Sequence, residues 1–262
     1  MMSRPDLLLE KTDGCGILTI NRPDALNAIT AEMLFEGFND CFERAHKDED
    51  INVLILTGAG RAFCSGLDLS AFESLTKPAS RFEFSQLYGD WALTLRSFTK
   101  PIIAAVNGAA MGGGLTLALL SDVRIASENA KFSSIWIKRG IIPDCSTTYF
   151  LPRIVGFPRA LEMMLTGEII NAREAEKIGL VKKVVPADKL MEEAMSIARS
   201  FAEGPSLAIG LCRQAAYASL DSSLEQQMHL EMLSVKGLLG SQDCRESVKA
   251  FFEKRKPRFI GR

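Results

Sequence analysis

Two continuous apolar runs constrain the fold more than any other feature of the chain. They read "INVLILTG" at residues 51–58 and "PIIAAVNG" at residues 101–108, and each ends in glycine. A strand with one face in water alternates apolar and polar residues, so an uninterrupted apolar run predicts a strand covered on both faces. Residues 29–48 instead carry apolar side chains at helical spacing, with Thr30 as a candidate cap. Buried strands that alternate with helices predict an α/β fold.

The remaining sequence divides into short strands and a long helical part. Further strands are predicted for "GILTINRP", "VRIAS" and "KFSS", at residues 16–23, 123–127 and 131–134. From residue 146 onward the pattern is nearly all helical, with breaks near Gly167, Pro186, Pro205 and Ser222. We therefore expect a core over residues 1–200 and a C-terminal helical region over residues 201–262 that forms an arm or a lid.

The composition excludes several classes of function. With 31 basic and 32 acidic residues the chain has no basic field to hold a nucleic acid. No apolar run approaches the roughly 20 residues of a membrane span, and the first residues lack the apolar core of a secretory signal. We therefore expect a cytoplasmic protein. Its six cysteines, without CxxC spacing, read as free thiols, and two histidines disfavour a multi-histidine metal site.

Three glycines, Gly112 to Gly114, stand where a buried strand passes into a helix. Glycine lets a ligand approach the backbone, and the first N–H groups of a helix lack internal partners, so such a turn suits an anion or a developing oxyanion. Leu115 and Thr116 stand where a phosphate-binding loop needs lysine and serine or threonine, and GxGxxG spacing is absent. Close packing of the helix on the sheet is the alternative explanation.

The loop "AFCSGLDL", at residues 62–69, is a second candidate. Gly66 permits a turn that could present the Leu67 N–H toward the same space, although such loops are more often plain connections. Ser65 is not in a GxSxG elbow. Cys64 has no visible base and reads as a packed thiol.

Asp144, in "IIPDCSTTYFLPRIVG", is an acid between two apolar segments. It could cap the helix predicted from Ser146 onward, or it could be a catalytic acid or base. His46 and His229 lie in polar helical segments and read as surface or interface residues. The basic tail "EKRKPRFIGR" reads as a solvated end, with a phosphate-bearing ligand as the alternative.

Several segments together resemble the crotonase superfamily, also called the enoyl-CoA hydratase/isomerase family. They occur in the family's order and spacing from about residue 7 to the C-terminus, and they read "NRPDALNAI", "GRAFCSGLDL", "KPIIAAVNGAAMGGG", "SDVRIAS", "AKF" and "ALEMMLTGEIINAREAEKIGLVKKVVP". The resemblance implies a crotonase fold, a spiral of ββα units with a C-terminal helical trimerisation region. It also implies a homotrimer or hexamer acting on acyl-CoA thioesters in fatty acid metabolism, with no cofactor beyond the CoA of the substrate.

The resemblance also implies a set of site residues. An oxyanion hole for the thioester enolate is expected from the N–H groups of Leu67 and Gly113. The adenosine-phosphate part is expected near Arg22, Ala25, Leu26 and the loop Ala62–Asp68. The remaining residues expected to bind substrate are Cys64, Gly66, Gly114 and Trp136.

The chain departs from the pattern of true hydratases at two places. Their first glutamate follows the glycine triplet by two residues, where this chain has Thr116, and their second falls where it has Trp136. Because hydration needs a water held between two carboxylates, the resemblance does not imply simple hydration of a 2-enoyl-CoA.

Asp144 resembles the acid of two other branches. Ring-opening isomerases of phenylacetate catabolism carry "LIPDCGGT"-like text, in which the aspartate shuttles a proton. The dehalogenase of 4-chlorobenzoyl-CoA has Trp and Asp at the places of Trp136 and Asp144, but its histidine base corresponds to Gly89 here. The segment at residues 81–98 is expected to form part of the pocket wall, and its aromatic residues admit straight or aromatic acyl groups.

These branches lead to a preferred hypothesis and two alternatives. The preferred activity is conversion of a 3-enoyl-CoA to a 2-enoyl-CoA, with Asp144 carrying the proton. The expected apolar neighbourhood of Ile141, Ile142 and Trp136 would raise the pKa of Asp144. The alternatives are another crotonase reaction, hydratase-, dehalogenase- or hydrolase-like, and a member that binds CoA thioesters without catalysis.

Overall fold

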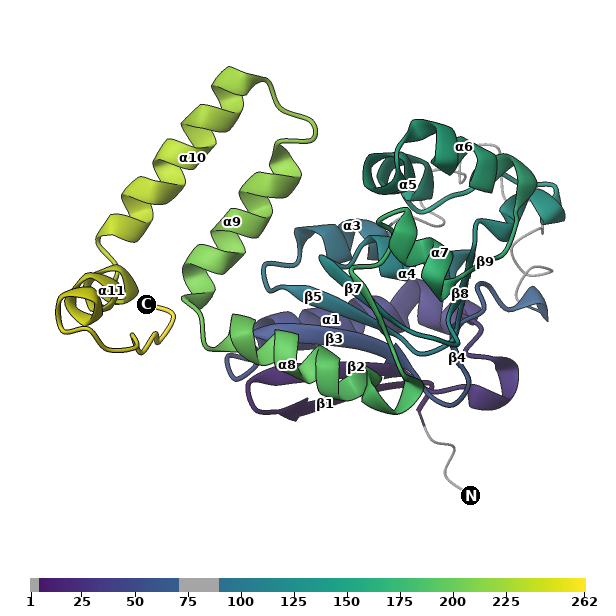
Figure 1. Cartoon of the computed structure of the whole chain (residues 1–262), viewed down its shortest axis with the longest axis horizontal. Helices are drawn as coiled ribbons and strands as arrows, with labels where there is room; N and C mark the ends of the chain where they lie inside the picture. Colours follow the sequence, from purple (N-terminus) through teal and green to yellow (C-terminus); the bar gives the residue numbers. More distant parts are fainter. Residues whose placement is uncertain (1–4, 71–89) are drawn as a thin grey trace.

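The structure is a computed structural model that describes residues 5–70 and 90–262. It contains two β-sheets wrapped by helices, with a helical arm at one side (Figure 1). The larger sheet has the strand order β1-β2-β3-β5-β7-β10 and the smaller one β4-β6-β8-β9. The strands are β1 Leu7–Thr12, β2 Cys15–Ile20, β3 Val53–Gly58, β4 Ala62–Cys64, β5 Ile102–Val106, β6 Ala109–Met111, β7 Val123–Ser127, β8 Lys131–Ser133, β9 Ile170–Asn171 and β10 Lys183–Val185.

Successive strand pairs build the two sheets as a spiral. In the pairs β3 and β4, β5 and β6, and β7 and β8, the first strand joins the larger sheet and the second joins the smaller one. The strands β3, β5 and β7 run parallel to one another, as do β4, β6 and β8, while β1 pairs antiparallel with β2 and β8 with β9. The predicted α/β spiral is therefore confirmed.

The two apolar runs form β3 and β5, and both are buried over their whole length as predicted. Val53 and Ile55 pack in a cluster with Ala194 of the helix α8, Leu190–Ala202. Leu54 and Leu56 belong to the larger core cluster. Because successive side chains of a strand point to opposite faces, these two memberships show that the sheet is covered on both sides, which explains the lack of alternation in the sequence.

Helices cover both sheets, and the turns that lead into some of them form the candidate site described below. The α-helices are α1 Phe38–Lys47, α3 Asp90–Ser97, α4 Gly113–Leu119, α5 Thr147–Val155, α6 Phe157–Thr166, α7 Ala172–Lys177, α8 Leu190–Ala202, α9 Ser206–Ala218, α10 Leu224–Leu239 and α11 Gln242–Phe252. The shorter helices are η1 Pro23–Ala25, η2 Met33–Gly37, η3 Ile135–Arg139 and η4 Ala187–Lys189, of which η2 is a π-helix. Thr30 caps the helical segment as predicted, since it directly precedes the first helical residue, Ala31, and its Oγ1 accepts the N–H of Met33 at 3.1 Å.

The short strands differ most from the prediction. The loop predicted at residues 62–69 contains β4, and the residues leading into the glycine triplet form β6. The part predicted as nearly all helical contains β9 and β10. These strands have two or three residues each, too few to show a period, and they form because each lies beside a strand of an existing sheet.

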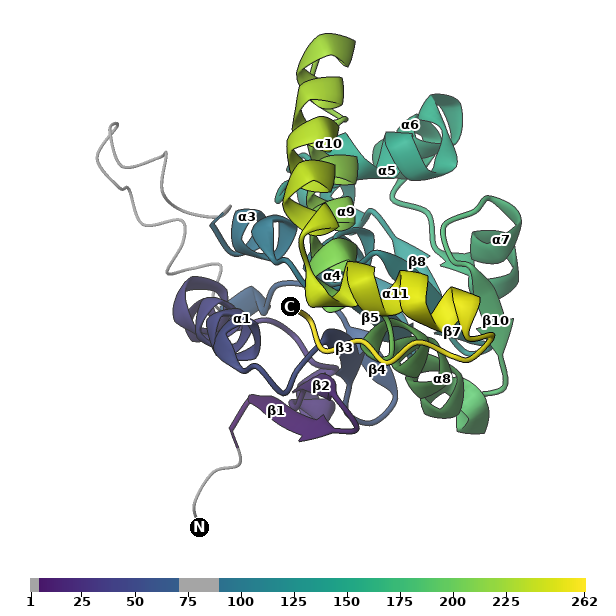
Figure 2. The same ribbon diagram turned by 90° about the vertical axis from the view of Figure 1, so that its left-hand side faces the viewer.

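The arm expected from the C-terminal sequence consists of α9, α10 and α11. Figures 1 and 2 show α10 lying beside α9, away from the sheets. Arg213 of α9 is buried and donates from Nε to both oxygens of Asp122, at 3.0 and 2.8 Å. Asp221 accepts from Arg96 of α3 and from the Tyr149 hydroxyl of α5, both at 2.6 Å. These contacts fasten α9 and the turn between α9 and α10 to the core, in part through α5.

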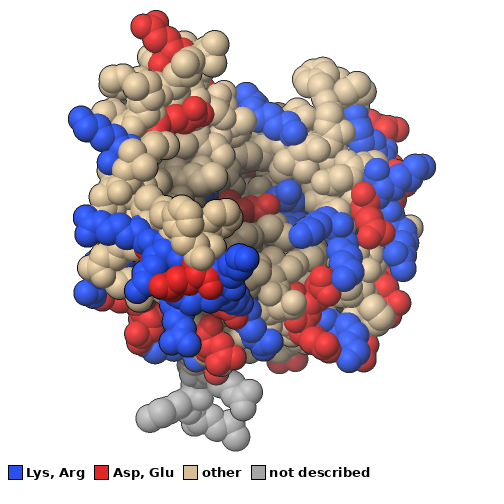
Figure 3. All heavy atoms as spheres, turned by 60° about the vertical axis from the view of Figure 1, so that its left-hand side comes forward, with Lys and Arg blue, Asp and Glu red and all other residues tan. Residues whose placement is uncertain are grey.

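The outer part of the arm exposes a row of large apolar side chains. They lie on α10 and are Leu224, Met228, Met232, Leu233, Val235 and Leu239, each more than half exposed. Within residues 5–70 and 90–262, no helix is long and apolar enough to cross a membrane. On the face shown in Figure 3, Lys and Arg side chains are interspersed with Asp and Glu.

Candidate active site

The glycine triplet forms the turn between β6 and α4. Gly112 has φ +53°, in the region that favours glycine, and its N–H donates to the carbonyl of Ser133 at 3.1 Å. The helix begins at Gly113, whose N–H therefore has no acceptor within the helix. At Gly114 a Cβ would lie 2.1 Å from the carbonyl oxygen of Cys64. Close packing and a free donor, the two explanations of the triplet, are thus both present.

The second turn follows β4. Gly66 has φ +97°, and the next residue, Leu67, forms an isolated parallel bridge with Ile29. The bridge uses the Gly66 carbonyl, which accepts from Ile29 at 2.8 Å, and the Asp68 N–H, which donates to Ile29 at 2.9 Å. Because successive N–H groups of an extended segment point to opposite sides and the Asp68 N–H points toward Ile29, the Leu67 N–H points away from Ile29.

The two turns are in contact. A Cβ on Gly66 would lie 2.9 Å from the Met111 carbonyl oxygen and 3.6 Å from the nitrogen of Gly113. The structure therefore brings the residues expected to form the oxyanion hole, Leu67 and Gly113, into adjacent turns. Two backbone donors in such a place can stabilise negative charge that develops on a thioester oxygen.

The loop after β2 braces the second turn. Arg22 donates from Nη1 to Asp68 at 2.9 Å and to the carbonyl of Ala28 at 2.5 Å. The hydroxyl of Ser70 and then the guanidinium of Arg22 lower the pKa of Asp68. The Leu26 carbonyl accepts from Ser65 at 3.1 Å. The loop after β2 and the loop after β4, which were expected to lie near the adenosine-phosphate, are thus in contact. The Arg22 guanidinium already forms an ion pair with the carboxylate of Asp68.

Asn27 is a structural residue of this region that we did not predict. It is fully buried with φ +57°, and its Nδ2 donates to the carbonyls of Ala59 at 2.9 Å and Ala62 at 2.6 Å. An Asn inside an otherwise apolar segment, "ALNAI", was the available signal, because a buried amide needs partners.

The side chains of β4 face the core. Ala62 and Cys64 are both buried, and burial raises the pKa of the Cys64 thiol to about 12. The prediction of a packed thiol is confirmed. Only the backbone of these residues can face a ligand without rearrangement.

Asp144 lies in the loop between η3 and α5, and Trp136 of η3 holds its carboxylate. The indole Nε1 donates to Oδ1 at 3.0 Å. A Cβ on Gly112 would lie 4.0 Å from Cε2 of the same indole, so Trp136 packs against the turn that carries Gly113. The indole is buried, whereas Asp144 keeps an exposed surface. This arrangement places a fixed, accessible carboxylate beside the oxyanion turn.

Partial desolvation raises the pKa of Asp144, and hydrogen bonds from the Cys145 thiol and the Trp136 indole oppose that rise. The predicted direction of the shift is confirmed, but Ile141 and Ile142 are 39% and 76% exposed, and the Trp136 indole, expected to add to the rise, opposes it through its hydrogen bond. A raised pKa suits a group that must take and return a proton near neutral pH.

The interpretation of Asp144 as a helix cap is wrong. Helix α5 begins at Thr147, its N-cap is Ser146 with φ +75°, and the cap makes no side-chain hydrogen bond. Asp144 contributes only its backbone carbonyl, which accepts from the Thr147 N–H at 2.9 Å. Its carboxylate is turned toward Trp136.

The two places that hold glutamates in hydratases are occupied differently here. Trp136 donates to Asp144, and Thr116 is fully buried with its Oγ1 2.8 Å from Oγ1 of Thr147. Cys145 and Thr147 are site residues that sequence reasoning missed. Thr147 meets Thr116, 31 residues away in the chain, whereas Cys145 acts on its neighbour Asp144, and no local sequence pattern indicates either contact.

The other candidates lie elsewhere. His46 and His229 are exposed as predicted, and His46 packs on Phe98 with ring centroids 5.6 Å apart. Residues 81–89 of the predicted wall at residues 81–98, Gly89 among them, lie outside the described residues. Among residues 5–70 and 90–262, no group of three His, Cys, Asp or Glu is placed to hold a metal ion.

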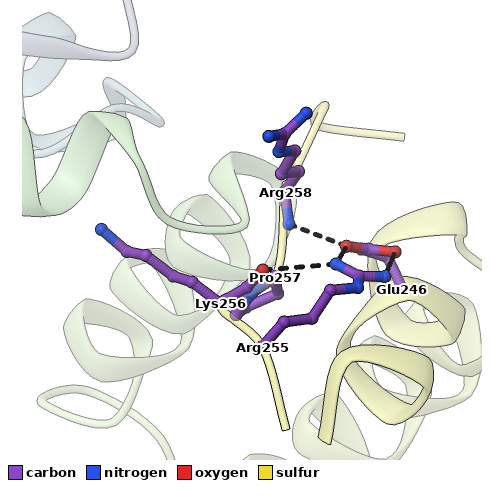
Figure 4. Close-up of a pocket in the computed structure, with 5 residues that line it drawn as sticks. All are labelled: Glu246, Arg255, Lys256, Pro257 and Arg258. Atoms are coloured by element: carbon purple, nitrogen blue, oxygen red, sulfur yellow. Dashed lines mark hydrogen bonds and ion pairs between the residues drawn. The ribbon is translucent and has the colours of Figure 1, made fainter. Parts of the chain in front are cut away.

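The basic tail lines a separate hollow of about 670 Å³ near the C-terminus (Figure 4). Arg255 donates to both oxygens of Glu246, at 2.6 and 2.9 Å, and the Arg258 N–H donates to the same carboxylate at 2.9 Å. These donors lower the pKa of Glu246 to about 2. The positive charge of the Arg255 guanidinium is therefore already paired with a carboxylate of the same chain.

Replacing Trp136 with Phe is expected to shift the pH dependence of any reaction in which Asp144 acts as a base. The indole hydrogen bond favours the ionised carboxylate, so its loss raises the pKa of Asp144 further. The acid limb of the kcat profile, below which the base is protonated, then moves to higher pH. An unchanged limb would show that the indole does not act on the reacting carboxylate.

Comparison with known proteins shows one family. The model of the enoyl-CoA hydratase/isomerase family matches residues 10–262. A 1,2-epoxyphenylacetyl-CoA isomerase of Escherichia coli (strain K12) is 39% identical over 253 residues, which cover 95% of this chain and 96% of that protein. A crotonyl-CoA hydratase of Syntrophomonas wolfei is 37% identical over 262 residues, all of both proteins. The solved structure of an enoyl-CoA hydratase from Mycobacterium tuberculosis H37Rv matches with TM-score 0.89 at 31% identity, over 99% of this chain and 100% of that one.

Proposed function

The chain belongs to the enoyl-CoA hydratase/isomerase family, and we propose that this enzyme is an isomerase that converts a 3-enoyl-CoA to a 2-enoyl-CoA. The single observation that carries the proposal is the Asp144 carboxylate held by Trp136, whose indole packs against the turn that leads into Gly113. One carboxylate beside an oxyanion hole is sufficient for moving a proton between two carbons.

The proposed reaction uses one base and no added water. Asp144 takes the proton from C2 of the acyl group, and the electron pair of that C–H bond enters a dienolate whose oxygen is held by the N–H groups of Leu67 and Gly113. The protonated Asp144 then returns the proton to C4, and the double bond moves to C2–C3. The raised pKa of Asp144 supports both steps, because the same group must accept and then donate.

Hydration is less well supported by the same site. A 2-enoyl-CoA hydratase needs a water activated between two carboxylates, and Thr116 and Trp136 occupy the corresponding places. The Thr116 hydroxyl is buried and bonded to Thr147, and the Trp136 N–H is bonded to Asp144. Neither group can act as the missing base. Dehalogenation is not favoured either, since Gly89 offers no base to activate a hydrolytic water.

A proton-tracing experiment tests the single-base mechanism. The protein is incubated with a 3-enoyl-CoA in deuterium oxide, and the 2-enoyl-CoA formed at early times is analysed by NMR for hydrogen isotopes at C4. Transfer by one carboxylate, if faster than exchange of its proton with the solvent, is expected to leave part of the product with protium that came from C2. Product carrying only solvent deuterium at C4 from the first turnovers would contradict transfer by Asp144 alone.

We also propose that the arm assembles copies of this chain into a homotrimer or hexamer. The row of exposed apolar side chains on α10 supports this, since a monomer seldom leaves such a patch in water. Light scattering of the purified protein should therefore give three or six times the chain mass of 28.7 kDa. A mass equal to one chain would contradict the proposal.

A further inference from the structure

Two threonines join the halves of the candidate site through a buried contact. Thr116 and Thr147 are both fully buried, and their hydroxyl oxygens are 2.8 Å apart. They lie on different helices, α4 and α5, and are 31 residues apart in the chain. A hydroxyl pair of this kind is directional, so it fixes the spacing and rotation of one helix start against the other in a way that apolar packing does not.

Each threonine is linked by a backbone hydrogen bond to one part of the candidate site. Thr116 lies in the first turn of α4, and its N–H donates to the carbonyl of Gly112 at 3.0 Å. It therefore belongs to the same rigid turn as the Gly113 N–H. The Thr147 N–H donates to the backbone carbonyl of Asp144 at 2.9 Å. A short path thus runs from the oxyanion turn, through the two hydroxyls, to the backbone of the acid.

The loop that carries Asp144 needs such a restraint. Cys145 and Ser146 have φ +48° and +75°, which side-chain-bearing residues seldom adopt and which persist only where the surroundings hold them. Thr147 follows them directly and is fixed by both its backbone and its hydroxyl. The loop is thus anchored at this end by Thr147, while Trp136 anchors the carboxylate itself.

We propose that the Thr116–Thr147 hydroxyl pair is a positioning contact that sets the place of the Asp144 carboxylate relative to the Leu67 and Gly113 N–H groups. The inference rests on the proposed function and adds to it. Thr116, which stands where a hydratase has a catalytic carboxylate, has a positioning role here. Neither threonine needs to touch the substrate.

The test replaces Thr147 or Thr116 with Val, which keeps the shape and removes the hydroxyl. For either variant we expect kcat for isomerisation to fall about 10- to 100-fold, the scale of a misplacement of about 1 Å, with KM nearly unchanged. Thr147→Ser, which restores the hydroxyl, should recover most of kcat. The double Val variant should be no slower than the slower single variant, because both changes break the same bond.

Thr57→Val is the matched control. Its buried hydroxyl donates to the carbonyl of Ala105 at 3.0 Å, within the larger sheet. It should lower the thermal midpoint as the site variants do but leave kcat unchanged. An equal loss of kcat in Thr57→Val, a change in KM alone, or no recovery with Thr147→Ser would overturn the proposal. If one Val variant does not fold, the other tests the same bond.

A second readout separates this inference from the proposed function. Exchange of the C2 protons of a saturated acyl-CoA with deuterium oxide requires the acid and the oxyanion hole but no shift of a double bond. Wild-type protein that exchanges these protons without isomerising a 3-enoyl-CoA would contradict the proposed function. The positioning contact would still be tested, because it predicts slower exchange in the Val variants than in wild type. Wild-type protein that does neither would contradict both.

Discussion

Asp144→Asn is expected to lower kcat for isomerisation by about 10²- to 10⁴-fold, the usual contribution of a positioned general base. Asparagine keeps the shape and can still accept the Trp136 hydrogen bond through its carbonyl oxygen, so binding of the acyl-CoA should change little. Stopped-flow or steady-state assays, together with a direct binding measurement, separate the two effects. Asp188→Asn, at an exposed position in η4, is the matched control and should behave as wild type.

The same variant should be at least as stable as wild type at neutral pH. The folded pKa of Asp144 is raised, so the ionised form is disfavoured in the folded state. The stability associated with this group is greatest below the ordinary aspartate pKa and decreases as pH rises through the folded pKa. Asparagine carries no such cost. Activity within a few-fold of wild type, or a marked fall in the thermal midpoint, would contradict the account of Asp144.

Gly114→Ala is expected to have the second large effect. The new Cβ would lie 2.1 Å from the carbonyl oxygen of Cys64 and 2.8 Å from its Cβ, so α4 must shift away from β4. That shift moves the neighbouring Gly113 N–H. Loss of one oxyanion donor lowers kcat by about 10²- to 10³-fold in other enzymes, and overpacking costs about 1–3 kcal/mol of stability.

Kinetics and chemical denaturation of Gly114→Ala measure the two consequences separately. Gly240→Ala is the matched control, because a Cβ there meets nothing within 4 Å and its φ of −86° suits alanine. It should leave both quantities near wild type. A Gly114→Ala variant with full kcat would show that the turn does not hold the reacting oxygen.

The long apolar strands could be predicted from the sequence because burial on both faces leaves an uninterrupted run of apolar residues. β3 and β5 are buried on both faces, and their sequences show no polar alternation. The glycine triplet was informative for a similar reason, since a backbone approach as close as that at Gly114 admits no side chain. The resemblance to a family then placed Leu67 and Gly113 in adjacent turns, as the structure has them.

The partners of Asp144 could not be predicted in this way. Its hydrogen bond to Trp136 depends on the course of η3 and of a loop with two left-handed residues, which no period in the sequence encodes. The Thr116–Thr147 contact joins residues 31 positions apart and exists only once α4 and α5 have packed. The same dependence on context made the cap interpretation wrong, because Asp before a helix is a common cap and only tertiary contacts turn it elsewhere.

We propose above all that this member of the family shifts a double bond and hydrates poorly. The most direct measurement is the kcat/KM of the purified full chain for isomerisation of a 3-enoyl-CoA, beside its kcat/KM for hydration of the corresponding 2-enoyl-CoA, both followed by product chromatography. The account predicts isomerisation faster by about 100-fold or more, since hydration lacks its second carboxylate. Hydration as fast as or faster than isomerisation would contradict it.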